Sequence, residues 1–164
     1  MQLAGDGLLS SNEELRRSVA EEIAGHEWEW AERVSSALDR VEQALRQHIV
    51  DAEAPAGLFT TEVDLTRPSL VRQVSKLRRE HTNFLEQASA LRSNVKAAAH
   101  AFCPNQHMAQ LAGMLPEPAP EGRIVDLDTI RHAIENFITT LLLHRDREVD
   151  LSIESVTTDL GAGD

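Results

Sequence analysis

The sequence has one cysteine, no tyrosine and few other aromatic residues. A single cysteine, Cys103, excludes an intramolecular disulfide and suits a reducing compartment, so we expect a cytoplasmic protein. No apolar run approaches the ~20 residues that a membrane-spanning helix needs. The stretch that contains Asp6 and Glu13 also lacks the basic and apolar regions of a signal peptide. These absences predict a chain without a membrane partner.

Basic residues are also scarce, with 16 Lys and Arg against 27 Asp and Glu, and the net charge is −11. No Lys/Arg cluster is long enough to follow a phosphate backbone, which argues against a nucleic-acid partner. The chain has no Gly-rich phosphate loop and no convincing Ser–His–Asp order. No Glu is followed three residues later by His, the spacing that ferritin-like carboxylate oxidases use. We therefore do not expect an enzyme.

Long runs rich in Ala, Leu, Glu, Arg and Gln favour helices. A capping box at Ser11 and Glu14 predicts the start of the first helix, Pro68 the start of the third, and Asp126 or Asp128 the cap of the fourth. The expected helices are 11–25, 27–54, 67–100 and 126–152, with a long irregular link at 103–122. We expect one all-α domain over 1–164, folded as an up-down-up-down four-helix bundle.

The last expected helix carries an apolar stripe that continues into two polar residues. Its apolar members are Ile130, Ile134, Phe137 and Leu141. The next positions on the stripe, by three and four, are His144 and Glu148. This i, i+4 pair points two potential metal ligands inward from one helix face. An isolated pair of this kind is more often a core histidine bonded to its helical neighbour.

Two other expected helices also replace one stripe residue with histidine, namely His48 and His81. At a rise of 1.5 Å per residue, His81 and His144 each lie about 27 Å from the helix ends that the long link joins. His48 lies about 32 Å from the same end of the bundle. Imidazoles and carboxylates at one depth of a helical core are typical of sites for iron or a similar transition metal. The alternative is a polar core without metal.

These motifs resemble the hemerythrin-like (HHE cation-binding) family, bacterial type, from about residue 34 onward. The matching motifs are His48 with Glu53, Gly57-Leu58-Phe59, Pro68, Leu77-Arg78-Arg79-Glu80-His81, His144-Arg145-Asp146-Arg147-Glu148, and the tail Glu154 with Asp159-Leu160-Gly161. The resemblance implies a hemerythrin-like bundle with a non-haem di-iron centre. Such proteins bind, store or sense dioxygen, nitric oxide or iron, usually without turnover.

The resemblance also implies a role for each of five residues. His81 and His144 would ligate one iron and His48 the other, while Glu53 and Glu148 would bridge the two ions. The expected partners are therefore a metal ion and a diatomic gas, and the oligomeric state is left open, a homodimer included.

The chain departs from the usual pattern of the family at several places. The acid follows His48 by five residues, because Ala52 occupies the i+4 position, and Glu53 would face inward only if Pro55 distorts the last turn. If Glu53 does not face inward, Asp51 is the alternative ligand. Leu85 stands where a second histidine is common. A complete site implies two iron ions, a degenerate site one or none, and the alternative function is a metal-free helical interaction module with a relic site.

Overall fold

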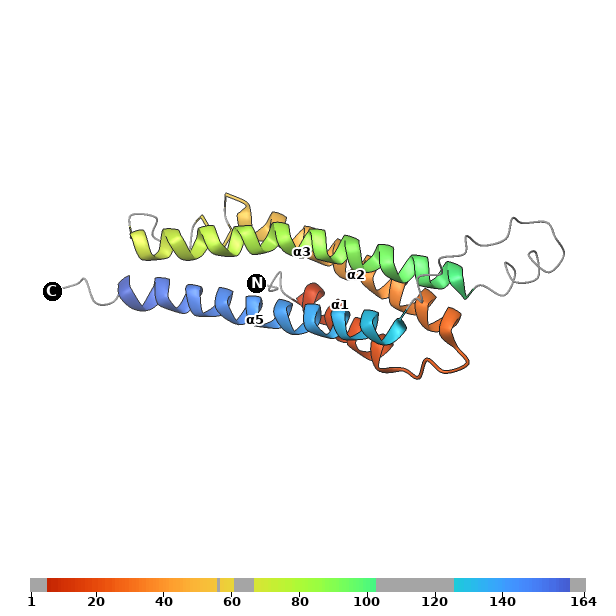
Figure 1. Ribbon diagram of the computed structural model, residues 1–164. Helices are drawn as coiled ribbons and strands as arrows, with labels where there is room; N and C mark the ends of the chain where they lie inside the picture. The colour runs from red at the N-terminus through yellow and green to blue at the C-terminus, as the bar shows by residue number, and fades with distance from the viewer. Residues whose placement is uncertain (1–5, 56, 61–66, 103–125, 160–164) are drawn as a thin grey trace.

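The computed structural model describes residues 6–55, 57–60, 67–102 and 126–159. These residues form four helices and no strand, which confirms the all-α prediction (Figure 1). The helices are α1 (Asp6–Ala20), α2 (Glu27–Glu53), α3 (Pro68–Ala101) and α5 (Leu127–Asp159). The expected irregular link at 103–122 lies outside the described residues.

The helices pack as a four-sided bundle in which each helix contacts two neighbours. The packed pairs are α1 with α2, α2 with α3, α3 with α5, and α5 with α1. Consecutive helices run in opposite directions, as Figure 1 shows, so the up-down-up-down arrangement is confirmed. α1 has 15 residues whereas the other three have 27 to 34, so α1 covers only part of the length of the bundle.

The predicted bounds of α2 and α3 agree with the structure within one residue, but those of α1 do not. The capping-box prediction at Ser11 is wrong. Ser11 lies inside α1, where its hydroxyl donates to the carbonyl oxygen of Gly7 over 2.8 Å. Leu8 is buried and adds one more turn to the apolar face of α1, which explains the earlier start. Gly25 makes the turn before α2 with a positive φ of 79°.

Of the two predicted caps for the last helix, the structure uses Asp126. Its carboxylate accepts the backbone N–H of Asp128 over 3.1 Å and the hydroxyl of Thr129. The hydrogen bond from the Thr129 hydroxyl is the main cause that holds the pKa of Asp126 below its ordinary value. α5 continues to Asp159, seven residues past its predicted end. Among the described helices, none combines the length and apolar character that crossing a bilayer requires.

The core has two hydrophobic clusters with a polar layer between them. The larger cluster includes Leu45 on α2, Phe84 on α3 and Leu141 on α5. The smaller one consists of Ala52, Phe59, Leu70, Val74, Leu77 and Leu151. On α2, α3 and α5 the residues between the two clusters are buried histidines, accompanied on α5 by a glutamate. The polar layer is therefore enclosed by apolar side chains on both sides along the bundle axis.

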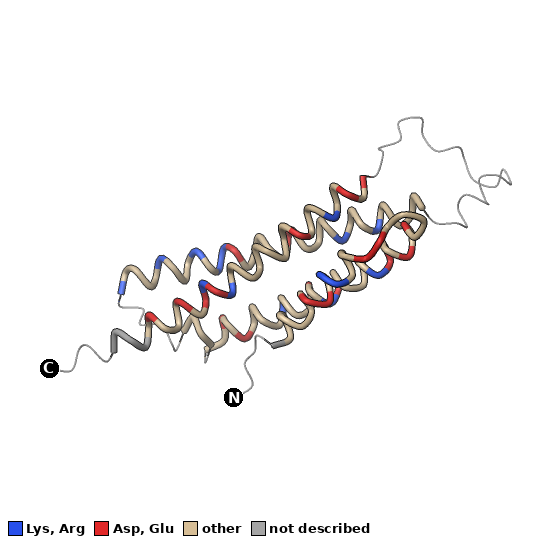
Figure 2. Tube along the Cα trace, turned by 90° about the horizontal axis from the view of Figure 1, so that it is seen from below, with Lys and Arg blue, Asp and Glu red and all other residues tan. Residues whose placement is uncertain are grey.

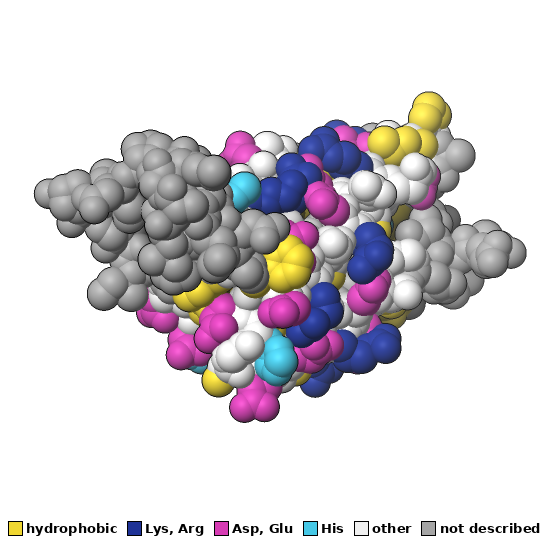
Figure 3. Space-filling model, turned by 90° about the vertical axis from the view of Figure 1, so that its right-hand side faces the viewer, with side chains coloured by type: hydrophobic (Ala, Val, Ile, Leu, Met, Phe, Trp, Pro, Cys, Tyr) yellow, Lys and Arg dark blue, Asp and Glu magenta, His cyan; other side chains and the backbone are white. Residues whose placement is uncertain are grey.

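The described surface carries charges of both signs. Acidic and basic residues are interspersed along the helices (Figure 2). They form exposed ion pairs, for example Arg40 on α2 with Glu14 on α1, and Arg33 on α2 with Glu21 just after α1. On the face shown in Figure 3, charged side chains of both signs surround scattered hydrophobic ones. Such exposed pairs contribute little to stability, so packing of the apolar faces is the main term that holds the helices together.

Candidate metal centre

The polar layer consists of His48 from α2, His81 from α3, and His144 with Glu148 from α5. All four are buried, with at most 4% of each residue exposed. Each occupies a place on the inward stripe of its helix, and the stripe residues before and after the polar positions are apolar. The helices therefore bring the three histidines to one depth, as the sequence predicted, and Glu148 lies beside them.

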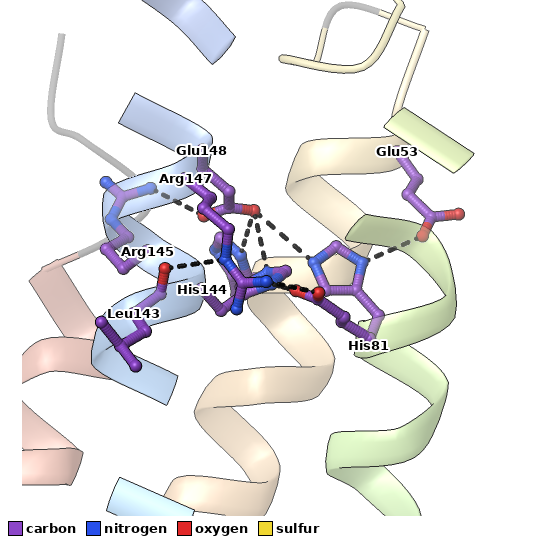
Figure 4. A network of polar contacts seen from close by, with 9 residues as sticks. Glu53, His81, Leu143, His144, Arg145, Arg147 and Glu148 are labelled. Carbon is purple, nitrogen blue, oxygen red and sulfur yellow. Dashed lines mark hydrogen bonds and ion pairs between the residues drawn. The ribbon is translucent and has the colours of Figure 1, made fainter. Parts of the chain in front are cut away.

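The four side chains converge on one point. Oε1 of Glu148 lies 2.9 Å from Nε2 of His48, 3.4 Å from Nε2 of His144 and 3.5 Å from Nε2 of His81. The four potential ligand atoms all lie within 4.8 Å of one another. Figure 4 shows the dashed lines that run from Glu148 to the histidine rings. Three nitrogen donors and one oxygen donor thus surround a single small volume.

In two of the rings, the nitrogen that faces away from the centre contacts a carboxylate. Nδ1 of His81 lies 3.1 Å from Oε1 of Glu53, and Nδ1 of His144 lies 2.8 Å from Oε2 of Glu80. An ionised carboxylate only accepts hydrogen bonds, so each Nδ1 carries the proton and donates it. In the neutral ring, Nε2 then presents its lone pair to the centre. This carboxylate–histidine arrangement is the usual way in which proteins orient metal-binding imidazoles.

The inward nitrogens of these two rings are unpaired. Nε2 of His81 and Nε2 of His144 are buried and have no hydrogen-bond partner among the described residues. Buried polar atoms are normally hydrogen-bonded, and a buried acceptor without a donor is costly. A cation at the centre would satisfy both lone pairs. The residues present therefore fit a metal ion.

Aromatic rings close the centre against solvent. The ring of Phe59 stacks on His81, with centroids 5.5 Å apart and an angle of 24° between the planes. The ring of Phe84 meets His144 edge-on at 5.2 Å. Both phenylalanines are almost fully buried. A low local dielectric strengthens every charge interaction at this site.

Glu148 is ionised despite its burial. Burial alone would raise the pKa of Glu148, but the imidazoles of His144, His48 and His81 together outweigh that effect and hold its pKa far below its ordinary value. The centre therefore offers a negatively charged oxygen among three imidazole nitrogens. This combination favours a cation over a neutral or anionic guest.

Each of the three carboxylates also meets an arginine. Nη1 of Arg145 donates to Oε2 of Glu148 over 3.1 Å. On the outer side, Nη1 of Arg147 donates to Oε1 of Glu80 over 2.6 Å, and Nε of Arg78 lies 3.9 Å from Oε2 of Glu53. The carboxylates around the histidines are thus shared between a histidine and an arginine.

Of the five predicted site residues, the structure does not bring Glu53 into the cluster. α2 stays helical as far as Glu53, so Pro55 causes no distortion that would turn this side chain inward. Ala52 takes the inward position and is buried. Glu53 is exposed and points toward α3, where it holds the outer nitrogen of His81 instead. Asp51 accepts a hydrogen bond from Gln47 on its own helix and lies outside the cluster too.

Sequence reasoning missed the roles of Glu80 and Arg145. Glu80 precedes His81 by one residue on α3, so it is rotated toward α5, where it reaches His144. The sequence did contain a signal for this contact. Glu80 lies next to His81 on α3, and the neighbouring helix α5 also carries an inward histidine, His144. α1 supplies no member of the cluster among the described residues.

The fold and the cluster define the class: this protein is an all-α four-helix bundle with a buried His/Glu group that could hold a metal ion. Comparisons of the chain with family models, with curated proteins and with solved structures found no match.

Proposed function

We propose that this protein binds one transition-metal ion, iron in the first instance, through His48, His81, His144 and Glu148. The observation that carries the proposal is the pair of buried, unpaired Nε2 atoms on rings whose Nδ1 atoms are fixed by Glu53 and Glu80. Packing alone gives no reason to orient two lone pairs toward the same carboxylate oxygen. Metal coordination does.

The ligand geometry favours one ion over the two that the family resemblance implies. Two ligands on opposite sides of one ion are separated by about 4.2 Å when each bond is about 2.1 Å. The four donors already lie within 4.8 Å of one another, so small side-chain movements suffice. A second ion would need further ligands, and Glu53 is turned away from the centre. A single three-histidine, one-carboxylate site follows.

The donor types narrow the identity of the ion. Imidazole suits iron, zinc, copper and nickel, and a carboxylate oxygen adds preference for a harder ion than Cu(I). The resemblance to hemerythrin-like proteins favours iron within this set. Four protein donors leave positions free on an ion that takes five or six ligands. A diatomic gas such as dioxygen or nitric oxide is the ligand that we propose for such a position.

The proposal is tested by metal analysis of protein purified without chelators, followed by anaerobic titration with Fe(II). We expect about one iron per chain, and loss of bound iron to background in His144→Ala with the helical content unchanged. His132→Ala is the matched control, because His132 lies on the same helix and is exposed. Two ions per chain would instead support the di-iron centre that the family resemblance implies. No metal in the parent protein would leave a metal-free helical module.

A further inference from the structure

The two oxygens of Glu148 have different partners. Oε1 faces the three histidine nitrogens, whereas Oε2 accepts the hydrogen bond from Nη1 of Arg145. Figure 4 shows Arg145 on the opposite side of this carboxylate from the rings. The carboxylate therefore presents one oxygen to the centre and has the other held away from it.

Arg145 is suited to that role by its place on α5. It lies three residues before Glu148, so both side chains extend from neighbouring positions on one helix surface. The Arg145 side chain is 22% exposed, which places its charge at the edge of the buried centre rather than inside it. Arg147 cannot substitute for it, because its guanidinium bonds to Glu80 and to the carbonyl oxygen of Leu143.

The contact matters because a carboxylate turns easily about its last bond. That torsion is broad and roughly two-fold in glutamate, so packing alone does not decide which oxygen faces a ligand. A charge-assisted hydrogen bond from a partly buried guanidinium is strong enough to decide it. With Oε2 bound in this way, only Oε1 is available to the centre.

We propose that Arg145 is a positioning residue that restricts Glu148 to one coordinating oxygen and so keeps a coordination position open for an exogenous ligand. This inference rests on the proposed metal site. Removal of Arg145 has two expected effects. Oε2 becomes free to act as a second donor, and the carboxylate regains its full negative charge. Metal affinity then stays equal or rises, while affinity for an added ligand falls.

The test uses the full chain loaded with Co(II), whose visible absorption reports the number and arrangement of its ligands, and azide as the added ligand. The variants are Arg145→Ala, Arg145→Lys and the control Arg72→Ala, which removes an exposed arginine on α3. In Arg145→Ala we expect an altered Co(II) spectrum before azide is added, and an azide dissociation constant about tenfold higher or more. Arg145→Lys should recover part of the azide affinity, and Arg72→Ala should match the parent.

Several outcomes would overturn the inference. One is a parent protein that binds Co(II) but not azide. Another is an Arg145→Ala variant whose Co(II) spectrum and azide affinity equal those of the parent; the metal site then stands and only the role of Arg145 falls. A parent that binds neither Fe(II) nor Co(II) removes the proposed function and this inference together. If Arg145→Ala is poorly folded, the comparison of Arg145→Lys with the parent decides, because a lysine cannot reproduce the planar guanidinium contact.

Discussion

Oε2 of Glu80 lies 2.8 Å from Nδ1 of His144, and Oε1 of Glu80 accepts a hydrogen bond from Nη1 of Arg147, which lies on the same helix as that histidine. One carboxylate on α3 thus fixes both the tautomer of a buried ring on α5 and the position of α5 beside it. The side chain is 18% exposed, so its hydrogen bonds are only partly screened by water.

The first prediction concerns Glu80. Glu80→Ala should weaken metal binding by about 10- to 100-fold, because the ring of His144 loses the partner that orients it. Glu80→Gln should be milder, since the amide oxygen can still accept from Nδ1. Competitive titration against a chelator measures both. Glu86→Ala, which removes an exposed glutamate on α3, is the control, and an equal effect of both changes would contradict the role of Glu80.

The second prediction separates Glu53 from Asp51. Because Glu53 holds the outer nitrogen of His81 and does not enter the cluster, Glu53→Ala should lower metal affinity by about tenfold without changing the number of ions bound. Asp51→Ala should have no effect on the metal, as its partner is Gln47. Metal-to-protein ratios at saturation give the answer. A lower ratio in Glu53→Ala would make Glu53 a ligand and revive the two-ion site.

The third prediction concerns the turn after α2. A Cβ on Gly57 would lie 2.5 Å from the carbonyl oxygen of Ala52, closer than real Cβ atoms come to any atom. Gly57→Ala should therefore displace the turn and, with it, Phe59. The backbone N–H of Phe59 donates a hydrogen bond to the carbonyl oxygen of Ala52, and its ring stacks on His81. We expect a loss of about 1–3 kcal/mol in the free energy of unfolding, measured with urea, and weaker metal binding.

Gly7→Ala is the control for that change. Gly7 is exposed on α1, and nothing lies within 4 Å of its added Cβ. Alanine favours a helix by at most about 1 kcal/mol over glycine, so this variant should be as stable as the parent or slightly more so. If Gly57→Ala behaves in the same way as Gly7→Ala, the close approach at Gly57 has no energetic consequence.

The fourth prediction is a pH dependence of the metal-free protein. The pKa of Glu148 in the folded chain is below its ordinary value of 4.5, so folding favours the ionised carboxylate. This stabilisation is complete above pH 4.5 and is lost as the pH falls from there through the lower folded pKa. The stabilisation that the parent has over Glu148→Gln should therefore shrink as the pH falls below 4.5. A difference that grows on acidification would contradict the assignment.

The apolar stripes were sufficient to predict much of this structure. On α5 the spacing of Ile134, Phe137 and Leu141 sets the direction in which His144 and Glu148 must point, and the structure buries all five. The common depth of the three histidines could be predicted from helix rise and from the alternating direction of consecutive helices in an up-down-up-down bundle. Local periodicity plus length thus located the cluster.

The rest depended on contacts that no local pattern encodes. Glu80 and His144 are 64 residues apart, and their pairing follows from how α3 and α5 are rotated against each other. Glu53 could be placed only once the end of α2 was known to remain helical. The sequence at Ser11 is suited to capping a helix, but α1 begins earlier and buries Leu8. Burial of a leucine side chain contributes more to the free energy of folding than a helix cap does.

The pairing of carboxylates with arginines has a consequence for oxidation state. The pairs are Glu148 with Arg145, Glu80 with Arg147, and Glu53 with Arg78. The charges of Glu148 and Glu80, whose arginine contacts are closest, are thereby partly offset. The net charge of the buried group then depends mainly on the charge of the ion that enters. The cost of burying charge rises steeply with its magnitude, which disfavours a trivalent ion more than a divalent one. Iron held here should therefore have a raised reduction potential and stay ferrous in air longer than iron among unpaired carboxylates.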